Sequence, residues 1–175
     1  MKNKQVFVIL SFIVVVLLST SCGTSKRSVP AEMNTPKELS RKFGLPVTTK
    51  DNLHLYTEAS KWLGVKHKYG GNTKKGVDCS GLVVQIYTEV YGKNLKRSSA
   101  DMLKYNCKKV SRGRLQEGDL VFFRTGNGKK KIPNHVGIYL KNQHFVHTSS
   151  SKGVIVGDLN DPYYLRNWIT GGRVK

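Results

Sequence analysis

Apolar residues recur at helical spacing between positions 78 and 92. They are Leu82, Val83, Ile86, Tyr87 and Val90. Asp78 precedes the run and suits an N-cap, because its carboxylate can accept hydrogen bonds from the amides of a first helical turn. Gly92 follows the run and suits the left-handed residue that ends a helix. The pattern therefore predicts a helix with Cys79 in its first turn.

Further helix starts are predicted on either side of this helix. Thr35 and Glu38 have the spacing of a capping box around Pro36, so a short helix is expected to run to residue 43 and stop at residue 44. A second helix is expected to start near residue 51 and to carry apolar positions 55, 59, 62 and 63 before residue 64. Residues 98–101 resemble another helix cap, and the glycine-rich stretch 69–76 predicts turns.

The second half of the chain has the pattern of strands. Short β-branched or aromatic runs occupy residues 120–123, 135–140, 144–148 and 153–156, and turn residues separate them. Helices followed by strands indicate an α+β fold, with N-terminal helices packed on an antiparallel sheet.

The register of one hairpin determines where two histidines point. If Leu140 pairs with His144 across a short loop, Gly137 lies opposite His147, and His135 shares that face diagonally. A slip by one residue would point the two histidines apart. Gly137 is expected to leave open space beside the imidazoles.

The N-terminal segment has the pattern of an export signal. Two lysines precede an apolar run over residues 6–18, which is short for a membrane-spanning helix, and small residues then lead to Cys22. The segment resembles a bacterial lipoprotein signal, so we expect residues 1–21 to be a signal peptide and Cys22 to carry lipid. An ordinary cleaved signal and an uncleaved anchor are the alternatives. Residues 22–34 are expected to be a flexible tether, and residues 35–175 a single catalytic domain.

The chain is strongly basic, with 30 Lys and Arg against 11 Asp and Glu and a formal net charge of +19. Such an excess of positive charge often indicates a protein that binds nucleic acid, but the export signal argues against that partner. Carboxylated peptides or phosphate-bearing polymers of the cell envelope are the expected partners. A generic basic surface is the alternative.

Cys79 has the setting of a nucleophile. The positive end of the helix dipole is expected to favour its thiolate, and its main-chain amide to donate to an oxyanion. His135 would be the base, and His147 would orient its ring. Three alternatives remain: ordinary packing of the cysteine and the histidines, zinc binding by the same three residues, and a disulfide between Cys79 and Cys107.

Five motifs in order resemble the NlpC/P60 family of cell-wall cysteine peptidases. The motifs are Gly70-Gly71, Asp78-Cys79-Ser80-Gly81-Leu82-Val83, Gly118-Asp119-Leu120-Val121, His135-Val136-Gly137-Ile138-Tyr139 and Phe145-Val146-His147. The resemblance runs from about residue 53 to the C-terminus. It implies a papain-like fold with Cys79 as nucleophile, His135 as base and His147 as third catalytic residue, and it requires no metal or organic cofactor.

The resemblance also implies a substrate and its contacts. Asp78 and Ser80 would help to hold the amino end of a peptidoglycan stem peptide, although helix capping and packing are their alternative roles. His67 stands where many members have a tyrosine and could donate a hydrogen bond towards the oxyanion. The expected reaction is hydrolysis of a stem-peptide amide, most commonly the bond from γ-D-glutamate to the diamino acid.

Two other functions stay open at this stage: cell-wall binding without cleavage, and amidase or acyl-transfer chemistry on another envelope substrate. The expected location is the cell envelope. A lipid anchor would hold the domain in the outer membrane facing the periplasm, since Gly23 follows Cys22 in place of an aspartate that favours inner-membrane retention.

Overall fold

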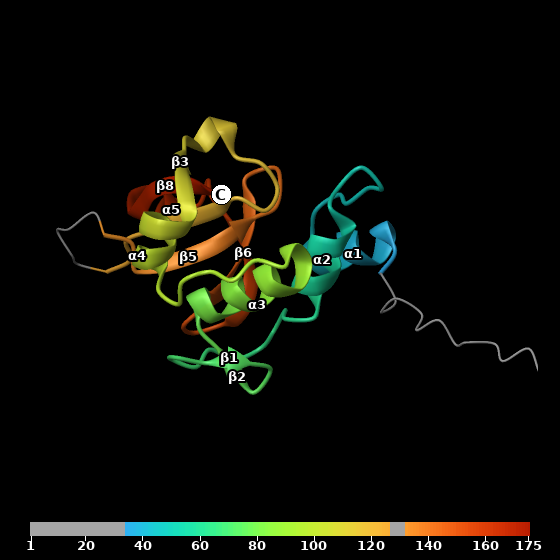
Figure 1. Ribbon diagram of the computed structural model, residues 1–175. Coiled ribbons are helices and arrows are strands. Elements are labelled where there is room, and N and C mark those ends of the chain that lie inside the picture. Colours follow the sequence, from blue (N-terminus) through green and yellow to red (C-terminus); the bar gives the residue numbers. More distant parts are fainter. Residues whose placement is uncertain (1–33, 127–131) are drawn as a thin grey trace, which may run out of the picture. The chain divides into compact units, whose positions relative to one another are not determined.

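The helix that was predicted to carry Cys79 in its first turn forms as the sequence indicates. The computed structural model describes residues 34–126 and 132–175, all within the unit Glu32–Lys175, and α3 spans Cys79–Tyr91 (Figure 1). Asp78 is its N-cap and accepts from the Gly81 N–H at 2.7 Å, while Gly92 ends the helix with φ of 61°. Cys79 is therefore the first helical residue. The expected signal peptide, the lipidation site at Cys22 and most of the tether lie outside the described residues.

The N-terminal helices confirm one prediction and correct another. Helix α1, Pro36–Phe43, has the predicted capping box between Thr35 and Glu38 and stops at Gly44. Helix α2, Leu53–Ser60, is shorter than expected. It ends three residues early because the chain turns towards the sheet, where the Gly64 N–H donates to the carbonyl of Val154 at 2.9 Å.

The sheet has six strands in the order β3-β8-β4-β5-β6-β7, and all neighbours are antiparallel. Four strands were predicted and are confirmed. Strand β4, Leu120–Phe123, has the predicted ends, and three others end at slightly different residues: β5 His135–Tyr139, β6 His144–Ser149 and β7 Gly153–Asp158. The α+β architecture is therefore confirmed.

Several elements were not predicted. They are the hairpin strands β1 (Asn72–Thr73) and β2 (Gly76–Val77), the sheet strands β3 (Cys107–Val110) and β8 (Trp168–Val174), the short helix α5 (Pro162–Asn167) and the 3-10 turn η2 (Arg112–Arg114). The cap at Ser98 does start a helix, α4 (Ser99–Asp101), which continues as the π-helical turn η1 (Met102–Asn106). Strand β3 was missed because it is an edge strand with exposed Lys108 and Lys109 and therefore lacks an apolar run.

The β5–β6 hairpin has the predicted register. Gly137 pairs with His147, and the Leu140 N–H donates to the carbonyl of His144 at 2.9 Å. The expected open space beside Gly137 is wrong, however. A Cβ there would lie 2.7 Å from Phe145 Cδ2 and 3.1 Å from His147 Cβ, so glycine is needed for close packing.

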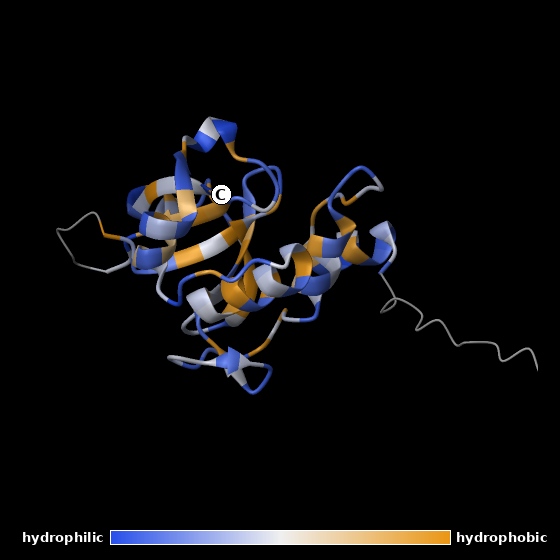
Figure 2. Cartoon of the chain, viewed as in Figure 1, coloured by the Kyte–Doolittle hydropathy of each residue, from blue (hydrophilic) through white to orange (hydrophobic). Residues whose placement is uncertain are grey.

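Apolar residues cover both faces of the sheet. Helix α3 packs on β5 and β6, and the buried side chains of this layer include Leu82, Ile86, Val136, Ile138 and Val146 (Figure 1). Figure 2 shows α3 and β5 largely apolar, whereas the β1–β2 hairpin is polar. A second cluster, which includes Phe123 and Phe145, packs against Tyr164 and Trp168 around α5. The two layers hold the sheet rigidly behind the start of α3.

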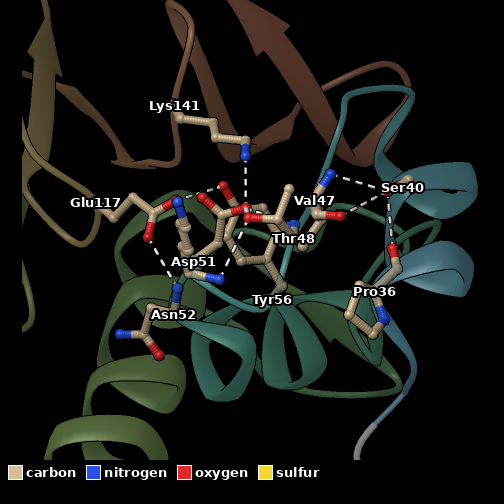
Figure 3. Close-up of polar contacts among 10 residues, drawn as sticks. Pro36, Ser40, Val47, Thr48, Asp51, Asn52, Tyr56, Glu117 and Lys141 are labelled. Atoms are coloured by element: carbon tan, nitrogen blue, oxygen red, sulfur yellow. Dashed lines mark hydrogen bonds and ion pairs between the residues drawn. The ribbon is translucent and has the colours of Figure 1, made fainter.

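A polar network ties the N-terminal helices to the sheet (Figure 3). Glu117 accepts from the Asn52 N–H and from the Tyr56 hydroxyl, each at 2.9 Å. Lys141, just after β5, forms an ion pair with Asp51. Burial raises the pKa of Tyr56, so its hydroxyl stays protonated and continues to donate to Glu117. These contacts fix α2 against the loops that flank β4 and β5.

Within residues 34–126 and 132–175, no helix combines the length and the apolar character needed to cross a membrane.

Candidate active site

A pocket of about 690 Å³ opens at the start of α3 and brings the three predicted catalytic residues together. Cys79 comes from α3, His135 from the first position of β5, and His147 from the middle of β6. The remaining predicted site residues, His67, Asp78 and Ser80, also line this pocket. The fold therefore gathers all the predicted site residues except Cys22, which lies outside the described residues.

The two histidines form a direct hydrogen bond. His135 Nε2 lies 2.9 Å from His147 Nδ1, and the two rings are nearly perpendicular. Because this contact occupies Nε2 of His135, Nδ1 is the ring nitrogen left to accept a proton from the thiol. His147 is only 2% exposed, so its ring is held by its surroundings. The predicted register is confirmed and brings the two imidazoles into contact, and the orienting role of His147 stays a prediction.

Burial keeps both imidazoles neutral. It lowers the pKa of His135 to about 4, and the charge of nearby His67 acts in the same direction. Burial also lowers the pKa of His147 to about 3, with a smaller contribution from His135. At neutral pH both rings are therefore uncharged, and His135 can act as a base.

The expectation that the helix start favours the Cys79 thiolate is wrong for the resting site. Burial raises the pKa of the Cys79 thiol, and the Asp78 carboxylate adds to this rise. Backbone N–H groups of Val136, Ser80 and Cys79 oppose the rise but do not outweigh it. At neutral pH Cys79 is therefore a neutral thiol that lines the same pocket as the neutral His135, so attack by its sulfur would require loss of the thiol proton.

Both cysteines in the described part of the chain are free. Cys107 is buried on β3, where burial raises the pKa of its thiol to about 12, and its Sγ packs near Gly172. The alternative of a Cys79–Cys107 disulfide is therefore wrong. Cys107 instead acts as a small apolar residue of the core.

This difference predicts selective alkylation. Iodoacetamide is expected to modify Cys79, which borders the pocket, and to leave buried Cys107 unmodified in the native protein. Because the pKa of Cys79 is raised, the thiolate fraction and the alkylation rate should still be increasing above pH 9. Peptide mass spectrometry after timed labelling measures both, and a rate that is already constant at pH 7 would contradict the neutral resting thiol.

The depressed pKa values of the histidines also predict a loss of stability in mild acid. A histidine in the unfolded chain has a pKa near 6.5. Below that pH the unfolded chain therefore binds protons at these two residues, whereas the folded protein leaves both imidazoles neutral. The stabilisation is complete above pH 6.5 and decreases as the pH falls towards about 4 for His135. We expect the free energy of unfolding to drop by roughly 2 kcal/mol per histidine between pH 7 and pH 5. Denaturant titrations should show a smaller drop for His135→Asn, and an equal drop would contradict the assignment.

Arg97 is a site residue that sequence reasoning did not single out. Its two terminal nitrogens bind the two carboxylate oxygens of Asp78, each at 2.8 Å, and Nη1 also donates to Ser80 Oγ at 2.6 Å. Asp78 accepts the Gly70 N–H as well as the α3 cap bond. The Arg97 hydrogen bonds and the backbone donors outweigh burial and lower the pKa of Asp78, so this carboxylate stays ionised. The capping role of Asp78 is thus confirmed. The planar guanidinium of arginine can donate two parallel hydrogen bonds to one carboxylate, which a lysine ammonium cannot do.

His67 lines the pocket from the segment before β1. It is exposed, and its backbone bridges to Val77 just before Asp78. This position allows its side chain to reach the pocket, and its charge already acts on His135.

Zinc binding was the other chemistry considered for these residues. Across the two described segments, no group of three or more His, Cys, Asp or Glu side chains has the arrangement of a metal site.

The chain belongs to the NlpC/P60 family, whose model matches residues 64–173. It is 44% identical over 113 residues to the murein DD-endopeptidase MepS/murein LD-carboxypeptidase of Escherichia coli K12, covering 65% of this chain and 57% of the relative. It is 37% identical over 120 residues to the probable endopeptidase NlpC of the same organism, covering 69% and 76% of the two chains. The matched region thus spans a little more than half of MepS.

Solved structures agree with this membership. An NlpC/P60 family protein from Bacillus cereus superimposes with a TM-score of 0.63 at 28% identity, covering 70% of this chain and 39% of that one. The family resemblance read from the motifs is therefore confirmed.

Proposed function

We propose that this protein is a peptidoglycan endopeptidase that hydrolyses stem-peptide amides through an acyl-enzyme on Cys79. The observation that carries the proposal is the pocket at the start of α3, where Cys79 meets the hydrogen-bonded pair His135 and His147. A cysteine, a neutral base and a residue that orients the base are the parts of a thiol peptidase. The name of MepS, a murein DD-endopeptidase, supports the substrate class, and that of NlpC, a probable endopeptidase, supports the reaction type.

The proposed reaction starts from the neutral pair. Cys79 Sγ attacks the carbonyl carbon as its proton passes to Nδ1 of His135. The main-chain N–H of Cys79 donates to the resulting oxyanion, and His67 is a second candidate donor. The imidazolium then gives its proton to the leaving amine as the C–N bond breaks. Water, deprotonated by His135, attacks the thioester and releases the acid and the thiol.

Substrate binding is proposed to use the polar wall of the pocket. Asp78 and Ser80 would receive the amino end of the stem peptide, with Arg97 holding both in place. The basic surface would attract carboxylated peptides and raise their local concentration.

The location is part of the proposal. Removal of residues 1–21 and lipidation of Cys22 would tether the domain to the outer membrane, facing peptidoglycan in the periplasm. Mass spectrometry of the mature N-terminus, with Cys22→Ala as control, tests this anchor separately from the activity.

The test of the activity is digestion of defined muropeptides by the purified domain, with products identified by mass spectrometry. New amine termini at the γ-D-glutamyl bond would support the bond that the motifs imply. Cleavage at a D-alanyl cross-link would support the bond in the name of MepS. Binding to peptidoglycan without any new terminus would overturn the proposal in favour of a non-cleaving wall-binding domain, and products of acyl transfer would favour the third alternative.

A further inference from the structure

A tyrosine from α5 extends the histidine pair. Tyr164 Oη lies 2.8 Å from Nε2 of His147, which is the ring nitrogen that His135 does not use. Tyr164 also lines the pocket. His135, His147 and Tyr164 thus form one hydrogen-bonded series that ends on α5, and Cys79 lines the same pocket as its first member, His135.

The two hydrogen bonds allow only two proton arrangements for neutral rings. In the first, His135 carries its proton on Nε2 and donates to Nδ1 of His147, which then carries its own proton on Nε2 and donates to Tyr164. In the second, every proton is reversed: Tyr164 donates to His147, and His147 donates from Nδ1 to His135. Only the first arrangement leaves Nδ1 of His135 without a proton and able to accept one from Cys79.

We propose that Tyr164 is a positioning residue whose hydroxyl accepts the Nε2 proton of His147 and so selects the arrangement in which His135 is a base. The inference rests on the proposed function, because it assigns a role within the same catalytic site. Tyr164 touches neither the nucleophile nor the substrate in this role. It acts through His147 alone.

The surroundings of Tyr164 suit an acceptor. Burial raises the pKa of Tyr164 to about 12, so the hydroxyl keeps its proton at neutral pH. Tyr164 is only partly buried and lines the pocket, so that proton can point away from His147 and leave the oxygen lone pairs for the imidazole. The ring is fixed by aromatic contacts to Phe123, Phe145 and His147, with centroids 5.3, 4.9 and 5.4 Å away.

The alternative is that Tyr164 only fills space in this aromatic cluster. Tyr164→Phe separates the two explanations because it keeps the ring and removes the oxygen. His147 would then have a buried Nε2–H without an acceptor, and the reversed arrangement would become populated. A purely packing role predicts no change in either protonation or turnover.

The experiment combines kinetics with nitrogen NMR. For Tyr164→Phe we expect kcat on a muropeptide to fall about 10-fold to 100-fold with KM within about twofold of the wild type. Spectra of ¹⁵N-labelled histidines should show Nε2–H on both rings of the wild type and a shift towards Nδ1–H in the variant. Tyr105→Phe is the matched control, since it removes the hydroxyl of an exposed tyrosine on η1 that does not line the pocket.

A second background makes the test stricter. In His147→Asn, an amide oxygen can accept from His135 and cannot change tautomer, so adding Tyr164→Phe should alter kcat by less than about twofold. Unchanged histidine spectra, an unchanged kcat, or the same loss in both backgrounds would overturn the role of Tyr164. A wild-type protein that cleaves no muropeptide would instead overturn the proposed function, and the NMR comparison would still decide which tautomer Tyr164 selects.

Discussion

Replacing Cys79 with alanine is expected to lower the rate of peptide release from peptidoglycan by at least about four orders of magnitude. Among the described residues, Cys79 is the one thiol that lines the pocket, and the serine hydroxyls there are far weaker nucleophiles at neutral pH. The fold should be retained. Cys79 is the first residue of α3, and the Asp78 cap and the apolar layer behind it do not depend on the thiol.

The measurement is product release from defined muropeptides, with circular dichroism and thermal unfolding as checks on the fold. Cys107→Ala is the matched control, because it removes the other described thiol from the core and leaves the pocket intact. It should keep close to full activity with a modest loss of stability. Full activity of purified Cys79→Ala protein would contradict the proposed mechanism.

Gly81→Ala is expected to lower the free energy of unfolding by about 3 kcal/mol and to impair turnover at least tenfold. A Cβ at this position would lie 2.2 Å from the carbonyl oxygen of Gly71, which is main chain and has little room to move. The same oxygen accepts from the Asp78 N–H and from Arg97. The extra methyl group would therefore displace the loop that holds the first turn of α3 and the nucleophile with it.

Denaturant unfolding and muropeptide kinetics on the same preparation test this expectation. Gly113→Ala is the matched control, since a Cβ on that residue would meet no atom within 4 Å. It should change stability by less than about 0.5 kcal/mol. If the Gly81 and Gly113 variants were equally stable, the loop that carries Gly71 would have moved to accept the extra methyl group, and the expectation would be wrong.

Helix-capping and hairpin rules were sufficient to predict the parts of the site that depend on residues close together in sequence. The cap at Asp78 and the stop at Gly92 define α3 within one stretch of chain. The short loop between β5 and β6 limits the ways in which Leu140 and His144 can pair, and that register decides which face His147 occupies. These features depend on short-range geometry, so the sequence alone predicts them.

Features that depend on distant segments were not accessible in the same way. Arg97 contacts Asp78, which is 19 residues away in sequence, and Tyr164 contacts His147, which is 17 residues away. Both contacts depend on how separate elements pack, and the hydrophobic pattern of the sequence does not predict that packing. Strand β8 contains Gly171 and Gly172, which make a weak strand pattern. They are required there because Leu115 and Phe122 pack within 3 Å of where their side chains would begin. The pKa of Cys79 was misjudged for the same reason, since its burial is a property of the assembled layers.

The neutral resting thiol of Cys79 has a consequence for durability. Thiolates attack peroxides and disulfides far faster than thiols do, so a cysteine that keeps its proton at neutral pH is oxidised more slowly. A periplasmic or extracellular compartment is oxidising and offers no glutathione pool to rescue a sulfenic acid. If the domain works in the envelope as proposed, the burial that disfavours ionisation of Cys79 would also protect its sulfur from oxidation.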